Sequence, residues 1–388
     1  MQKEREIKRK APASEGGRYK RAEKSTCRDA CATRAGLRLA KCFAAVLGDG
    51  LHFWRGEGRS AGALRSTMKR IFILLGLGVC ALLLAPCEAT AGNLSLPPGT
   101  DVILEHIYSG RSDLAIPEAQ AFEREQPEHP LGYLLEAEAR WWQIWCLSAD
   151  YKYGMSLPRH RGKSSTDQVY LDVVAKAEAL AEADLGKHES AEMHLYAGMA
   201  GGLAARMYGL RAENRVAARA GVRAREHFLR ALALDPSLAD ADMGLGLYNY
   251  YVDTLSTIAR MLRFFMGIPG GSKEEGIRQL QLAMDHGQLT PSLARYYLAV
   301  CLHLYDQKYE QALQVATPLV EKYPENPIFR LVRGDLYGKL GRKAPAIADY
   351  RAAAEVQITD AACRKKIDQL VKESLAAQGA GGARAAGQ

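Results

Sequence analysis

The chain has 388 residues, of which 48% are hydrophobic and 25% are charged, a composition that excludes collagen-like, wholly disordered and multi-span membrane proteins. Its formal net charge is +8, but residues 1–67 carry 16 Lys/Arg against 7 Asp/Glu, whereas the rest of the chain carries 36 against 37. The main body is therefore nearly neutral and offers no basic face, so we expect no nucleic-acid partner.

The first 67 residues mix Arg, Ala, Gly and Lys without sustained periodicity. We interpret residues 1–67 as disordered, or as an upstream extension that results from a misassigned start. The second interpretation follows from Met68, which begins a segment with the features of a secretory signal.

Residues 68–91 have the order of parts found in a signal peptide. Two basic residues follow Met68, residues 71–85 are apolar, and small residues precede the bond between Ala91 and Gly92, where we predict cleavage. The apolar run of about 15 residues is shorter than the ~20 residues of a relaxed transmembrane helix. We therefore expect export to the periplasm or cell envelope. The alternative is that the segment is retained as a single N-terminal membrane anchor.

Cysteine usage does not indicate a disulfide-dependent fold. Five of the eight cysteines precede Gly92, which leaves Cys146, Cys301 and Cys363 in the body. An odd and sparse set is not a disulfide framework, so we expect these residues to act as small buried apolar side chains. One bridge stays open as an alternative if the compartment is oxidising.

From Asp101 onward the sequence predicts helices, because apolar residues recur at spacings of three and four. Internal similarity at a period near 34 residues indicates tetratricopeptide-type helical hairpins. In such a repeat small residues let two helices approach, and large residues fill the groove between hairpins. The unit that starts at Pro327 fits best, with its small and aromatic residues at the diagnostic positions: Gly334, Tyr337, Ala346, Tyr350 and Ala353.

The predicted fold is thus an all-α solenoid of tetratricopeptide-type hairpins over residues 92–376, with two inserted segments. The repeat phase is lost near 143–189 and again near 250–272. After the last repeat, residues 377–388 are rich in Ala and Gly, so we predict a disordered tail there.

The second insertion and its surroundings, roughly residues 240–350, resemble the tetratricopeptide repeat protein 39 / inclusion-body-clearance family. Exported bacterial tetratricopeptide proteins with the same segment are similar too, and closer. The chain departs from the family at Ser256 and Thr257, where prolines are usual. The resemblance implies a repeat fold with an interruption and transfers no catalytic residue. It rests on Gly246-Leu247-Tyr248-Asn249, Thr254-Leu255, Arg260-Met261-Leu262, Phe264, Gly267, Gly270 and Glu275-Gly276-Ile277.

Motifs that carry chemistry are absent from the sequence. The run His188-Glu189-Ser190-Ala191-Glu192 resembles a zinc-protease helix, but Glu192 stands where the second metal-binding His is needed. We therefore predict a protein that is not an enzyme, with no catalytic residue, no metal and no cofactor.

Aromatic residues in and beside the insertions are the candidate binding residues. They could line a groove for a ligand or partner, or fill the core where the first insertion packs. The second group could also touch a membrane surface, because arginines flank it. The candidate groove residues are Trp141, Trp142, Trp145, Tyr151, Tyr248, Tyr251, Phe264 and Phe265.

These features predict an exported, non-enzymatic scaffold that binds a protein partner, with peripheral membrane association left open. The alternatives are a binding module for a sugar or peptide that uses an aromatic cleft, and a membrane-anchored envelope protein. The first alternative requires exposed Trp141 and Trp145 rings.

Overall fold

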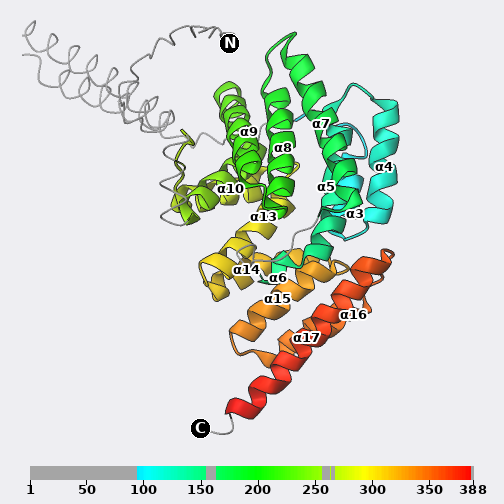
Figure 1. Ribbon diagram of the computed structural model, residues 1–388, viewed down its shortest axis with the longest axis vertical. Helices are drawn as coiled ribbons and strands as arrows, with labels where there is room; N and C mark the ends of the chain where they lie inside the picture. The colour runs from blue at the N-terminus through cyan, green and yellow to red at the C-terminus, as the bar shows by residue number, and fades with distance from the viewer. Residues whose placement is uncertain (1–93, 154–162, 256–262, 264–266, 386–388) are drawn as a thin grey trace, which may run out of the picture. The chain divides into compact units, whose positions relative to one another are not determined.

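A computed structural model describes residues 94–153, 163–255, 263 and 267–385 (Figure 1). The chain divides into two units, Met1–Cys87 and Glu88–Gln388, and all described residues belong to the second. The predicted signal peptide and the segment before it therefore lie outside the described residues.

The described residues form helices joined by turns, with no strand among them, which confirms the all-α prediction. No helix in this part of the chain is both long and apolar enough to cross a bilayer. The helices are α3 (Thr100–Tyr108), α4 (Ser112–Glu125), α5 (Pro130–Ser148), α6 (Asp150–Tyr153), α7 (Ser165–Leu185), α8 (Ala191–Leu210), α9 (Asn214–Leu234), α10 (Asp240–Thr254), α12 (Lys273–His286), α13 (Pro291–Val300) with the π-helix η1 (Cys301–Tyr305), α14 (Tyr309–Lys322), α15 (Pro327–Lys339), α16 (Lys343–Glu355) and α17 (Ala361–Ala385).

Consecutive helices pack in pairs, as tetratricopeptide hairpins do. The pairs are α3/α4, α5/α7, α8/α9, α10/α12, α13/α14 and α15/α16, and α17 packs on the last pair. Because each hairpin leaves an apolar face open, the next hairpin has to cover it. The predicted hairpin solenoid is confirmed.

Small and large residues fit together between hairpins as the repeat pattern predicts. The ring of Phe228 on α9 lies between Gly198 on α8 and Gly244 on α10, and a Cβ at Gly244 would come within 2.0 Å of the ring. In the last hairpin a Cβ at Gly334 would meet the Tyr350 ring at 2.6 Å. Only glycine leaves room for rings this close to a helix backbone.

The first insertion was predicted too long. Residues 143–189 include the end of α5 and all of α7, and α7 packs on α5 and α8 as the second helix of a regular hairpin. Its buried Ala177 and Ala181 let it approach its neighbours closely, although the spacing of its aromatic residues hides the repeat. The second interruption agrees with the connection between α10, which ends at Thr254, and α12, which begins at Lys273.

The C-terminal end also differs from the prediction. Helix α17 continues to Ala385, so residues 377–385 are helical and not a disordered tail. Alanine is the strongest helix former, and it dominates this segment. The side chain of Gln378 further lies against Gly338 of α15.

The solenoid closes on itself. Helix α5 of the second hairpin contacts α17, and α6 contacts α15, so segments about 200 residues apart lie side by side (Figure 1). A disulfide joins Cys146 on α5 to Cys363 on α17, and Cys301 stays free and buried. The expectation of three unpaired cysteines was therefore wrong, because closure brings two of them together.

Candidate functional site

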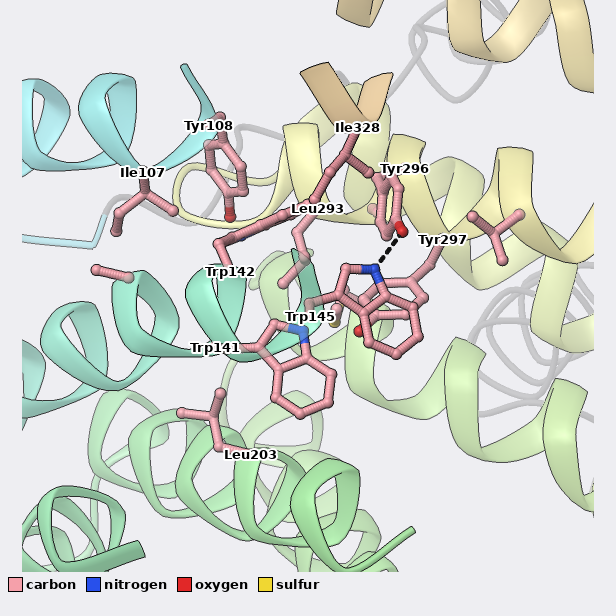
Figure 2. Close-up of a cluster of buried hydrophobic side chains, with 14 of the residues drawn as sticks. Ile107, Tyr108, Trp141, Trp142, Trp145, Leu203, Leu293, Tyr296, Tyr297 and Ile328 are labelled. Carbon is pink, nitrogen blue, oxygen red and sulfur yellow. Dashed lines mark hydrogen bonds between the residues drawn. The ribbon is translucent and has the colours of Figure 1, made fainter. Parts of the chain in front are cut away.

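The predicted groove residues of the first insertion are buried. Trp141, Trp142 and Trp145 are at most 4% exposed, and Tyr151 is fully buried. These three tryptophans belong to an aromatic cluster at the centre of the closed solenoid (Figure 2). Its members come from α3, α5, α13, the end of α14, and α15: Tyr108, Trp141, Trp142, Trp145, Tyr296, Tyr297, Tyr323 and Phe329.

Helix α5 explains why all three tryptophans are covered. Trp141 and Trp145 are four residues apart, lie on one face and stack, with centroids 5.3 Å apart and planes 21° apart. Trp142 points to another face, where it meets Tyr296 at 5.0 Å and Phe329 at 5.5 Å in edge-to-face contacts (Figure 2). Both faces of α5 are thus enclosed by helices of distant hairpins.

Polar atoms in the cluster find partners inside it. The indole nitrogen of Trp145 donates a 2.6 Å hydrogen bond to the Tyr296 hydroxyl, which is 151 residues away in the chain (Figure 2). Burial raises the pKa of Tyr296 well above its ordinary value, so its hydroxyl stays neutral. This bond ties the second hairpin to the fifth.

A buried ion pair lies beside the tryptophans. Arg206 on α8 pairs with Glu138 on α5, donates to the Tyr297 hydroxyl at 3.3 Å, and lies 4.6 Å from the Trp141 ring centroid. Burial opposes the charge of Arg206, but Glu138 and the neighbouring tyrosines outweigh burial and hold its pKa well above the ordinary value. Removal of either partner would leave an uncompensated buried charge, which costs about 3–5 kcal/mol.

A second polar network holds α6 against the last hairpin. The Lys152 ammonium donates to Asp335 at 2.7 Å and to the Ser374 hydroxyl at 2.6 Å. The Tyr350 hydroxyl donates to the same carboxylate at 2.8 Å. These contacts and the Cys146 disulfide close the solenoid on the same side.

No ligand-sized cavity lies near these residues. The larger of the two best-formed pockets among the described residues has a volume of about 40 Å³ and is lined by Trp142, Cys146, Asn326 and Cys363 among others. Pockets for small molecules measure roughly 300–1,000 Å³. The aromatic cleft expected for a sugar or peptide is therefore contradicted, because its tryptophans fill the core.

The other candidate residues lie apart from this cluster. Tyr248 is half-buried and donates a 2.9 Å hydrogen bond to the carbonyl of Pro269. Tyr251 is also half-buried and packs edge-to-face on Tyr250 and Tyr305. Phe264 and Phe265 lie outside the described residues. The eight predicted residues thus do not form one groove.

Two features of the cluster were missed at the sequence level: the tyrosines of α13 and the buried Arg206. Tyr296 and Tyr297 stand early in the first helix of a repeat, a position that faces the inside of a solenoid, and this register could have pointed to them. Nothing local marks Arg206, because its partner Glu138 is 68 residues away.

Catalytic chemistry finds no support in the described part of the chain. No group of three or more His, Cys, Asp and Glu side chains there could hold a metal ion. The zinc-like run is an ordinary helix start, with Ser190 capping α8 and the exposed His188 beside Asp184.

Comparisons with known proteins give a partial match. A family model described as "Regulator of microtubule dynamics protein 1-3" matches residues 159–327, which is less than half of the chain. No curated protein matches the chain.

Two solved structures of helical-repeat proteins are similar at low identity. Cut9–Hcn1 of the APC/C matches at 12% identity and a TM-score of 0.35, over 74% of this chain and 50% of that one. Yeast Tom70 matches at 8% identity and a TM-score of 0.25, over 72% and 88%. The chain thus spans half the length of the first of these proteins.

Proposed function

We propose that the chain is an exported, non-enzymatic scaffold that binds a protein partner through the outer face of its helical hairpins. Open solenoids bind partners on their concave surface. Here the aromatic cluster fills that surface, so the outer helix faces are what remains for a partner. The filled interior is the observation that carries this proposal.

The outer face of α9 is the best candidate for the contact. Seven large apolar side chains are exposed among the described residues, and three of them, Val216, Leu229 and Leu234, lie on this helix. At 3.6 residues per turn they share an arc of about 140° with the exposed Arg215 and Arg219. Apolar side chains mixed with arginine are typical of protein interfaces.

The disulfide supports export. Stable disulfides form in the periplasm and outside the cell and are rare in the cytosol. The bond between Cys146 and Cys363 joins the second hairpin to the last helix, so it has a structural position. Together with the signal-like residues 68–91 it favours cleavage between Ala91 and Gly92 over a retained anchor.

The family resemblances stay part of the proposal. The interruption between α10 and α12 fits the layout of the tetratricopeptide repeat protein 39 / inclusion-body-clearance family and of exported bacterial repeat proteins. The family-model match favours a second candidate, a partner of the kind that its description names, on microtubules.

Crosslinked affinity purification of the C-terminally tagged chain from fractionated cells tests the proposal. We expect a chain that begins at Gly92 and a stoichiometric envelope protein. Recovery of residues 1–67 with the chain would contradict export. Recovery of tubulin would favour the second candidate.

A matched pair of variants tests the contact face. We expect Val216→Ser with Leu229→Ser to reduce partner recovery, whereas Val102→Ser on α3, which is 48% exposed, should leave it unchanged. Equal recovery in all variants would contradict the role of α9.

A further inference from the structure

Two histidines face each other between α8 and α9. The Nδ1 atoms of His194 and His227 are 2.9 Å apart, which is a hydrogen-bond distance. The ring centroids are 5.2 Å apart, which is the separation expected when both nitrogens lie on the line that joins the rings. Two nitrogens placed head-on need one hydrogen between them, donated by one ring and accepted by the other.

Each ring also faces a carboxylate with its other nitrogen. The Nε2 of His194 lies 3.3 Å from Glu189, and the Nε2 of His227 lies 3.0 Å from Glu182 at the end of α7. A carboxylate accepts hydrogen bonds and does not donate them, so both Nε2 atoms carry hydrogen. Arg230 fixes Glu189 through two hydrogen bonds and keeps it ionised.

Proton counting then sets the charge of the pair. Two Nε2 hydrogens and one bridging hydrogen make three protons on two rings, one more than two neutral imidazoles hold. We propose that His194 and His227 share one proton and act as a proton-dependent clamp, which joins α8 to α9 and to the end of α7 at intermediate pH and weakens in acid.

A metal ion does not fit between these nitrogens. Imidazole nitrogens bind zinc at about 2.0–2.1 Å with their lone pairs converging on the ion. Nitrogens 2.9 Å apart would then have to point to a position beside the line that joins them, but these rings point at each other. The geometry therefore assigns a proton and not a metal to the pair.

The surrounding charges allow one proton and oppose a second. Glu182 and Glu189 favour the first, whereas Arg230 opposes additional positive charge. One turn before His227 on α9, Arg223 pairs with Glu178 of α7, and on the α7–α8 connection His188 lies near Asp184. Burial lowers the pKa of His194, the Glu189 hydrogen bond acts against burial, and the charge of His227 lowers it further.

The sign of the pH dependence follows from the second proton. An unfolded histidine binds its proton near pH 6.5. In the clamp a second proton would place two N–H groups head-on, so below that pH the folded pair binds fewer protons than the opened one. Stability is therefore present above about pH 6.5 and is lost as pH falls, by up to about tenfold in the opening equilibrium per pH unit.

Nitrogen-detected NMR of the histidine rings in the full chain tests the proposal directly. We expect the pair to titrate in two separate steps, with one bridging Nδ1–H at neutral pH and its loss in acid. Hydrogen exchange, corrected for its intrinsic pH dependence, should show the first turns of α8 opening as pH falls from about 7 to 5. Two independent titrations near the value of free histidine would overturn the proposal.

Matched variants separate the clamp from general acid effects. His194→Gln removes the bridging nitrogen, so its α8 exchange should lose the extra pH dependence, whereas His188→Gln on the exposed connection should behave like the wild type. Glu182→Gln keeps an acceptor but removes a charge, so the shared proton should leave at lower pH. If His194→Gln and the wild type open with the same pH dependence, the clamp does not exist.

Discussion

At the scale of single residues, the hairpins depend on positions where only a hydrogen fits. Phe228 occupies the space that glycine leaves on α8 and α10, and Tyr350 does the same at Gly334. The repeat pattern predicts these pairs because spacing alone places them. It does not predict the surroundings of Trp141, Trp142 and Trp145, because their covering residues come from hairpins about 150–220 residues away.

Gly244→Ala tests the packing of Phe228. The added Cβ would lie 2.0 Å from the ring, so the ring or the helix has to move. We expect a loss of about 1–3 kcal/mol in the free energy of unfolding. Gly202→Ala on α8 is the control, since nothing lies within 4 Å of its Cβ, and we expect no loss there or a gain of up to ~1 kcal/mol. Equal effects of both changes in denaturant unfolding would contradict the packing argument.

Glu123 on α4 gives the fold a pH dependence. Burial, and then its hydrogen bond with Glu136 and the charge of that residue, raise its pKa from 4.5 to about 8. The folded state therefore binds the proton more tightly than the unfolded state, so stability is fully present below about pH 4.5 and is lost as pH rises toward about 8.

Glu123→Gln should remove this dependence, because the amide stays neutral and can still donate to Glu136. Urea unfolding between about pH 5 and 8 measures it, with the exposed Glu125→Gln as control. A wild-type stability that does not fall over this range, after comparison with both variants, would show that the carboxyl is ionised in the folded protein.

At the scale of elements, closure depends on α17. This helix carries Cys363, and Ser374 on it receives the Lys152 hydrogen bond from α6. The helix itself is predictable from its alanines and apolar spacing. Its partner is not, because no local feature of Cys146 distinguishes it from the free Cys301, and only the return of the solenoid onto α5 does.

Removal of the disulfide tests the role of α17. The bond closes a loop with a sequence separation of 217 residues, so chain entropy predicts a contribution of up to about 5 kcal/mol. We expect reduction, or Cys146→Ser with Cys363→Ser, to lower the unfolding midpoint and to increase hydrogen exchange in α17 first. The double variant should not respond to reductant. An unchanged midpoint in the reduced wild type would contradict a structural bond.

At the scale of the whole molecule, the repeat pattern predicts hairpins and their order but not the closed arrangement. Each hairpin is specified by its neighbours, whereas closure depends on aromatic and charged contacts between hairpins two, five and six. The consequence is functional, since a filled interior moves the expected partner contact from the concave surface to outer faces such as that of α9.

Tryptophan fluorescence tests this closed arrangement most directly. The chain has four tryptophans, and Trp54→Phe leaves only the three of the aromatic cluster. We predict blue-shifted emission that acrylamide quenches poorly, and a shift to solvent-exposed values only on global unfolding, because all three rings are at most 4% exposed. Red-shifted and readily quenched emission from the folded protein would show that the interior is an open groove.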